Sequence, residues 1–221
     1  MNEILFLAHI IFITASTLGA LKLGKEALMS CIALQAVLAN FFVLKQITLV
    51  GFNATCSDVF IIGSVLGLNL LNEYFGPREA KLAVWISFAA MIFFGFMSQM
   101  HLFYIPSSFD SAHGHFLKLL TPAPRILVAS FAAYFISTRF DVWFYSFLKK
   151  MISEKLVLRT TLSIMTTQLL DTILFSFLGL YGVLNSILSI MFVSYLIKLS
   201  IIFISAPLSS FSKKIVKNEK V

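Results

Sequence analysis

The sequence predicts an all-α, polytopic membrane protein built as one bundle of about seven transmembrane helices. Hydrophobic residues make up 59% of the 221 residues and charged residues only 12%, whereas a soluble domain has roughly 45–50% and about 25%. The apolar residues also stand in long, continuous runs, while a transmembrane β-barrel would need short segments of alternating hydrophobicity. No run is left over for a soluble domain, so residues 1–221 are expected to form a single integral membrane domain.

Seven runs are long and apolar enough to cross a membrane, since a helical span needs about 20 mostly apolar residues. The expected spans cover residues 4–21, 27–44, 56–75, 82–105, 125–148, 160–181 and 185–208. The first run follows Met1, Asn2 and Glu3, which carry no basic side chain. We therefore expect a retained membrane helix there, because a signal peptide needs a basic n-region and a small-residue cleavage site.

The connections between these spans are short, apart from residues 106–124. In that loop the sequence FLKLL is expected to lie in the membrane interface as a brief amphipathic segment. Gly76, Pro77 and Arg78 close the third span, and a tight, uncharged turn at residues 181–185 separates the last two spans.

The basic residues predict the orientation of the bundle. Twelve of the 17 Lys and Arg residues fall on one side of the seven-span arrangement, three on the other, and two within spans. Because cytoplasmic loops carry an excess of Lys and Arg, the N-terminus is expected outside and the C-terminus in the cytoplasm of a bacterial inner membrane. The net charge of +7 is thus explained by topology, and no nucleic-acid partner is expected.

Polar residues inside the spans mark candidate functional positions, since ionisable groups in hydrocarbon are costly and usually face a cavity. Asp171 in the sixth span and Lys198 in the seventh both lie near the membrane midplane. They form either a purely structural ion pair or a substrate-facing carboxylate with a lysine neighbour. Gln168 and Asp171 share one helix face, and an amide with a carboxylate suits a flat heterocycle that carries N–H donors.

A second polar group closes the third span. Asn69, Asn72 and Glu73 share one face in its cytoplasmic third, where they could contact substrate or form an inner gate together with Asp141 of the fifth span. Asp58, at the external end of the third span, is expected in water. On composition alone, Arg125 at the start of the fifth span is expected to anchor this helix at the external membrane surface rather than to bind a ligand.

These residues favour a transporter of a small polar molecule. An intramembrane enzyme is the rival, but its one candidate pair, Asp171 and Thr172, points about 100° apart on a helix. The sequence has no GxSxG, HExxH or P-loop motif, and Cys31 and Cys56 lack metal-ligand spacing. No metal, cofactor or nucleotide hydrolysis by the chain itself is therefore expected.

Four stretches resemble, in order, the motifs of the YhhQ family of vitamin-uptake or queuosine-precursor transporters. LNLLNEYFG followed by REAK resembles the family's TDIINExYG signature. The stretches RILVASFAAYFISTRFDVWFY, SIMTTQLLDTILF and YLIKLSIIFISAP resemble three later helices of the family, and the match covers about residues 30–210. One departure stands out: the signature has Thr-Asp where this chain has Leu68 and Asn69.

The resemblance implies a six-helix core preceded by one additional N-terminal helix. It also implies uptake of 7-cyano- or 7-aminomethyl-7-deazaguanine, or of queuine, for salvage into tRNA queuosine. The candidate substrate-binding residues are then Asn69, Asn72, Glu73, Arg125, Tyr134, Asp141, Gln168, Asp171 and Lys198. Tyr134 or a nearby Phe is expected to stack on the base. The expected partners are the bilayer and a purine-like base, with a homodimer left open; the alternative is a substrate-capture subunit that needs a separate ATPase.

Overall fold

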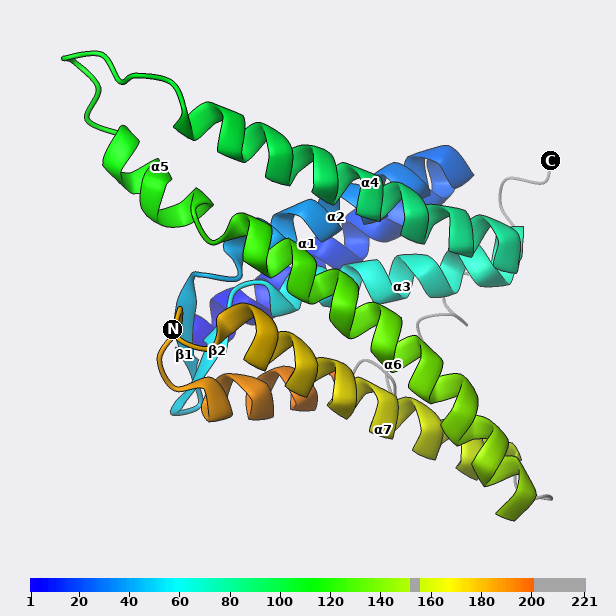
Figure 1. Cartoon of the computed structure of the whole chain (residues 1–221). Coiled ribbons are helices and arrows are strands. Elements are labelled where there is room, and N and C mark those ends of the chain that lie inside the picture. The colour runs from blue at the N-terminus through cyan, green and yellow to red at the C-terminus, as the bar shows by residue number, and fades with distance from the viewer. Residues whose placement is uncertain (152–155, 201–221) are drawn as a thin grey trace.

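The computed structural model of the chain describes residues 1–151 and 156–200. Its elements in chain order are α1 (Asn2–Leu23), α2 (Lys25–Phe42), β1 (Gln46–Leu49), β2 (Phe52–Thr55), α3 (Asp58–Phe75), α4 (Pro77–Leu102), α5 (His113–Leu120), α6 (Ala123–Met151), α7 (Leu156–Phe175), a π-helical segment (Ser176–Leu180) and a last helix (Ile187–Ser200). The π segment continues α7 directly, and the last helix is the orange one in Figure 1.

The helices confirm the predicted all-α class, and every expected span corresponds to one of them. Within the described residues, five helical stretches are long and apolar enough to cross a membrane: Asn2–Leu23, Lys25–Phe42, Pro77–Leu102, His113–Leu148 and Thr161–Leu180. The third expected span is α3, with 18 residues. The seventh is represented by the last helix, and its expected end at residue 208 lies outside the described residues.

One element was not expected from the sequence: β1 and β2 form an antiparallel hairpin in the connection between the second and third spans. Its two-residue turn places Val50 at φ 49° and Gly51 at φ 83°. Such turns match the twist of the strands and favour Asn-Gly, because both central residues need positive φ. The hairpin is tied to the start of α1: the amide of Asn2 donates to the carbonyl of Thr48 (3.0 Å), and the backbone N–H of Val50 donates to Glu3 (3.2 Å).

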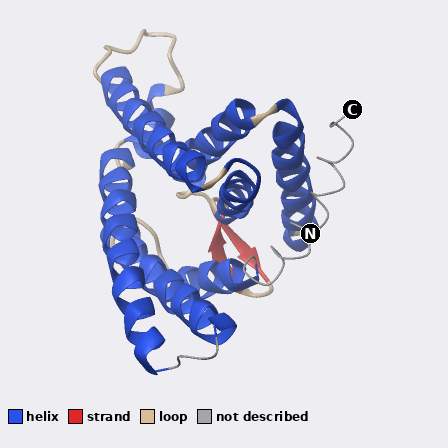
Figure 2. Cartoon of the chain, turned by 90° about the vertical axis from the view of Figure 1, so that its right-hand side faces the viewer, coloured by secondary structure: helices blue, strands red, loops and turns tan. Residues whose placement is uncertain are grey.

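The bundle consists of two halves. In the first half, α3 packs against α1, α2 and α4; in the second, α6 packs against α7 and the π segment. Figure 1 shows the halves meeting at the end that carries the hairpin and spreading apart toward the other end. Viewed along the bundle, α3 stands near the middle of the ring of helices (Figure 2).

Two glycines let α3 approach its neighbours closely. A Cβ on Gly63 would collide with the side chains of Ile13 and Gln35, and one on Gly67 would lie 2.6 Å from Cγ1 of Ile32. This small-xxx-small spacing is a common device for packing membrane helices, whose association gains little from the hydrophobic effect. It fixes α1 and α2 on one side of α3 and leaves the opposite face toward the second half.

The expected FLKLL segment lies in α5, a short helix that precedes α6 on the hairpin side of the bundle. Asp110 opens this helix by accepting the backbone N–H groups of Ala112 (2.7 Å) and His113 (3.1 Å). A carboxylate in this place satisfies backbone donors that a helix start leaves free.

Candidate functional site

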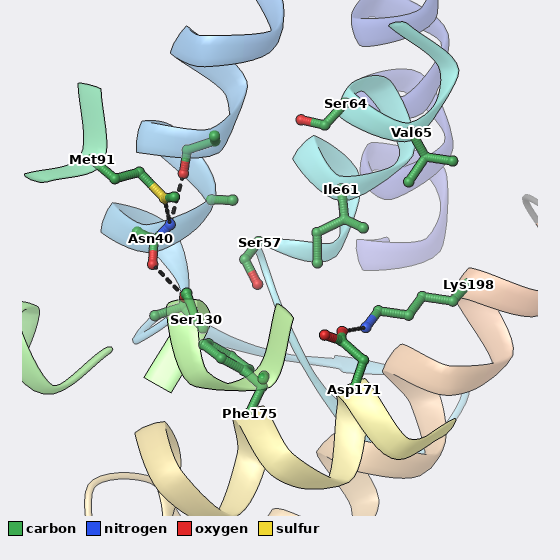
Figure 3. Close-up of a pocket in the computed structure, with 14 residues that line it drawn as sticks. Asn40, Ser57, Ile61, Ser64, Val65, Met91, Ser130, Asp171, Phe175 and Lys198 are labelled. Carbon is green, nitrogen blue, oxygen red and sulfur yellow. Dashed lines mark hydrogen bonds and ion pairs between the residues drawn. The ribbon is translucent and has the colours of Figure 1, made fainter. Parts of the chain in front are cut away.

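A cavity of about 230 Å³ lies between the two halves of the bundle. This volume is below the 300–1,000 Å³ typical of ligand pockets, which suits a small ligand. Its wall is mostly apolar, with a few polar side chains that come from different helices (Figure 3). The polar lining consists of Asn40 of α2, Ser57, Ser64 of α3, Ser130 of α6, Asp171 of α7 and Lys198 of the last helix.

On one wall, Asn40 and Ser130 form a hydrogen-bonded pair between α2 and α6. The Ser130 hydroxyl donates to Oδ1 of Asn40 at 3.1 Å and to its own helix at the carbonyl of Ile126. The amide nitrogen of Asn40 donates to the Ala36 carbonyl (2.9 Å) and contacts Sδ of Met91 (2.8 Å). Both halves of the bundle therefore hold this polar pair at the cavity surface.

On the opposite wall, Nζ of Lys198 lies 2.7 Å from Oδ2 of Asp171 (Figure 3). The predicted pairing of these two residues is confirmed. The Asp171 side chain is 26% exposed and that of Lys198 is 11% exposed. The second carboxylate oxygen, Oδ1, accepts only a long hydrogen bond of 3.4 Å from Ser137 among the described residues. Asp171 thus keeps acceptor capacity for a ligand in the cavity.

The hairpin end of the cavity is closed by buried apolar side chains. Val43 just after α2, Ile126 of α6, Leu180 of the π segment and Ile190 of the last helix pack together there, each no more than 2% exposed. Leu49 and Ala54 of the hairpin add a second buried cluster against Val193 of the last helix. These layers separate the polar cavity from this end of the bundle.

Asp58 lies within this closed end, which corrects the expectation that it sits in water. Asp58 is 2% exposed, and both of its carboxylate oxygens accept from the Ser194 hydroxyl at 2.9 Å. Its burial depends on the last helix, which arrives 136 residues later in the chain, so local sequence could not indicate it. Asp58 also borders a smaller cavity of about 30 Å³, which is lined as well by Lys198.

Toward the other end, Asn69, Asn72 and Glu73 are all exposed. Val65 lines the cavity, and residues four and seven positions further along an α-helix return to the same face. The cavity-lining face of α3 therefore continues through Asn69 and Asn72 toward Gly76. These three residues do not line the cavity itself; they form a polar face between it and the end where the halves spread apart.

Two other predicted site residues belong to the pairing of α6 with α7. Oδ1 of Asp141 accepts the hydroxyls of Ser163 (2.7 Å) and Thr167 (2.9 Å), which joins the two helices. Gln168 is half-buried and lies one turn from Asp171, outside the cavity lining.

Arg125 and Tyr134 also lie outside the cavity lining. The guanidinium of Arg125 donates to the carbonyls of Leu178 (2.8 Å) and Tyr181 (2.7 Å) and so holds the end of the π segment. The Tyr134 ring packs edge-on against Phe88 of α4, with ring centres 5.0 Å apart. The aromatic ring that lines the cavity is Phe175.

Asn40 is the main cavity residue that sequence reasoning did not select. It is an amide inside an apolar span, and that alone could have marked it, because polar side chains in membrane helices usually face the bundle interior. Ser130 was noted only as one of the positions that match the family motifs, not as a cavity residue. Nothing in the sequence marked Ser64, which stands among the apolar residues of α3. Within the described residues, no group of three or more His, Cys, Asp or Glu side chains could hold a metal ion.

Comparison with known proteins connects this cavity to transport. A family model described as "Putative vitamin uptake transporter" matches residues 55–211, well over half of the chain. The chain belongs to this family of transporters. A relative from Bacillus subtilis (strain 168), named "Probable queuosine precursor transporter", is 33% identical over 202 residues, covering 89% of this chain and 88% of the relative. No solved structure matches.

The family and the apolar helices together define a multi-pass membrane transporter of a small molecule rather than an enzyme. In such proteins the substrate site typically lies near the midplane, between halves that rock against each other. The cavity between Asn40 and Asp171 lies between the two halves of the bundle, with one end closed by apolar side chains.

Proposed function

We propose that the transporter imports a 7-deazaguanine precursor of queuosine, or queuine, across a bacterial inner membrane. The observation that carries the proposal is the carboxylate of Asp171, held at a small cavity opposite the Asn40 amide, in a chain whose relative is named for queuosine precursors. The excess of basic residues on one side supports an external N-terminus and a cytoplasmic C-terminus.

The chemistry of the cavity suits the edge of a guanine-like base. Such an edge presents a ring N–H and an amino group as neighbouring donors, and a carboxylate can accept both because each of its oxygens offers two lone pairs and it only accepts. Lys198 occupies Oδ2 of Asp171 at 2.7 Å, while Oδ1 remains available to the base. Hydrogen bonds to charged groups are roughly twice as strong as neutral ones, so this contact would dominate recognition.

Two further groups would complete the site. The Asn40 amide can exchange its contact with Ser130 for one with a polar edge of the base, and Phe175 offers an aromatic face to a flat ring. We assign stacking to Phe175 rather than Tyr134, because the Tyr134 ring is engaged with Phe88.

The exit route would follow the polar face of α3. Asn69 and Asn72 continue the cavity-lining face, and Glu73 follows at the end where the halves spread apart. With the hairpin end closed by Val43 and Ile126, this arrangement corresponds to a state open toward the cytoplasm. Asp141 would support the inner gate indirectly, by fixing α6 to α7 through Ser163 and Thr167.

The test uses a bacterial strain that cannot make queuosine and lacks its own uptake system, with this gene added. We expect queuosine in the tRNA of cells supplied with a 7-deazaguanine or with queuine, and none in cells with the Asp171→Asn variant. Asp110→Asn is the matched control, because Asp110 is an exposed carboxylate that accepts backbone N–H groups at the start of α5, away from the cavity. Absence of queuosine with every supplied base, despite normal membrane levels of the protein, would refute the proposal. Normal salvage by Asp171→Asn would refute the assigned site.

A further inference from the structure

Asp58 is a buried carboxylate whose side-chain hydrogen-bond partners among the described residues are hydroxyls. It is 2% exposed, Ser194 donates to both of its oxygens, and Thr55 donates at 3.4 Å. Thr55 in turn shares a 2.6 Å hydrogen bond with Ser57. Among the described residues no Lys, Arg or His nitrogen lies within ion-pair distance of Asp58. A charged carboxylate in such a place is costly, so it either carries a proton or recruits a cation.

Among the described residues, the cation that borders the same cavity as Asp58 is Lys198, which borders two cavities at once. It lines the main cavity, where it pairs with Asp171, and also the smaller cavity beside Asp58. Lysine has a flexible four-carbon stem that carries a compact charge, so one Nζ can serve two carboxylates in turn. The two carboxylates stand in opposite halves of the bundle, Asp58 at the start of α3 and Asp171 on α7.

Few other titratable groups face Asp58. The remaining polar residues of the small cavity are hydroxyls: Thr55, Ser57, Thr172, Ser176 and Ser194. Cys56 precedes Asp58 by two residues, and His9 of α1 packs against the Phe60 ring. The charge on Asp58 is therefore governed by its own proton and by Lys198.

From this arrangement, and on the basis of the proposed import function, we propose that Asp58 is the proton-loading site that couples substrate uptake to the proton gradient. With a proton on Asp58, the charges of Asp58, Asp171 and Lys198 sum to zero. Lys198 then stays paired with Asp171, the pairing that this structure shows. Loss of that proton leaves a net charge of −1 on these three side chains, and the negative charge of Asp58 draws Lys198 toward it. Asp171 then loses the partner that orients it, and its affinity for the base falls.

Proton and substrate consequently bind together, and the coupling is reciprocal: a proton on Asp58 strengthens substrate binding, and substrate strengthens proton binding by the same factor. This is the thermodynamic requirement for symport. A sodium ion fits the site less well than a proton, because it would lie beside the positive charge of Lys198.

The experiment uses the full chain in sodium-free proteoliposomes with labelled 7-cyano-7-deazaguanine, a neutral substrate. With an acidic exterior we expect the wild type to accumulate the base several-fold above equilibrium, and substrate addition to acidify the lumen. Asp58→Asn, which resembles the protonated state, should exchange labelled for unlabelled base but accumulate none. Asp110→Asn should accumulate the base like the wild type.

The outcomes separate this inference from the proposed function. If the wild type exchanges no deazaguanine, the import function fails and the coupling falls with it. If the wild type exchanges the base but accumulation ignores the pH gradient or follows sodium, only the proton site is wrong. Accumulation by Asp58→Asn would also overturn it. Should Asp58→Asn fail to fold, lumen acidification by the wild type on substrate addition decides the question alone.

Discussion

The ion pair between Asp171 and Lys198 yields the sharpest test of how the bundle is held together. Replacing one partner strands the other charge in the membrane, while replacing both, as Asp171→Asn with Lys198→Met, leaves no charge behind. We therefore expect each single variant to be less stable than the double variant. The pair of Lys25 and Glu79 is the matched control, because its charged atoms are 3.6 Å apart and its lysine is 42% exposed.

The expected magnitude follows from the geometry. At the observed 2.7 Å, the gross Coulomb attraction is ~6 kcal/mol for an effective dielectric constant of about 20. Removing one partner of a fully buried pair costs about 3–5 kcal/mol. Asp171 is 26% exposed to the cavity and Lys198 is 11% exposed, so cavity water screens part of the loss and we expect ~2–3 kcal/mol for each single variant.

The assay is thermal unfolding of the purified variants in detergent, combined as a double-mutant cycle. A loss of this size lowers Tm by about 2–4 °C per kcal/mol for a chain of this length. The double variant should recover most of the loss, which gives a coupling energy of ~2 kcal/mol or more for the pair. Lys25→Met with Glu79→Gln should show a coupling energy of less than about 1 kcal/mol, because this pair is longer and its lysine is more exposed to solvent. Equal, additive losses at Asp171 and Lys198 would show that the two charges do not stabilise each other.

Three further predictions concern the frame around the cavity, each measured by thermal unfolding in detergent. Gly63→Ala should destabilise the bundle by ~1–3 kcal/mol through overpacking. Gly19→Ala in α1 is the control and should not destabilise it, because a new Cβ there meets nothing within 4 Å. Equal effects of the two variants would contradict the close packing of α3. Val50→Asn should stabilise the hairpin by ~0.5–1 kcal/mol, because Asn adopts positive φ more easily than Val. The Val50 side chain is 79% exposed, so its replacement removes little packing. A lower Tm would contradict the turn geometry. Arg125→Gln should lower the stability of the bundle by ~2 kcal/mol, because it removes two charged donors from the carbonyls of Leu178 and Tyr181 at the end of the π segment. An unchanged Tm would indicate that Arg125 is only a surface anchor.

The helices could be predicted from the sequence because length and continuous apolarity suffice to identify membrane spans. Within the described residues each of the seven expected spans corresponds to a helix, and the early part of the chain differs mainly by the hairpin after α2. Its strands of four residues each are too short for a periodic pattern, and they depend on contacts with α1 and the last helix. Gly76 and Pro77 were informative because they end one helix and begin the next.

The cavity could be predicted only in part. Burial cost identified Asp171 and Lys198, since an ionisable residue at the midplane needs a partner, and the structure pairs them. Sequence reasoning placed Asp58 in water because its buried environment comes from Ser194, far away in the chain. Asn40 was overlooked because a neutral amide is less conspicuous than a charge, and its role depends on Ser130, 90 residues away.

The central claim is that this chain binds a 7-deazaguanine in the cavity between its two halves. An experimental structure with 7-cyano-7-deazaguanine bound tests it most directly. The account predicts the ring N–H and amino edge at Oδ1 of Asp171, the ring against Phe175, and Asn40 at the opposite wall. A base bound elsewhere in the bundle, or an empty cavity at saturating ligand, would contradict it.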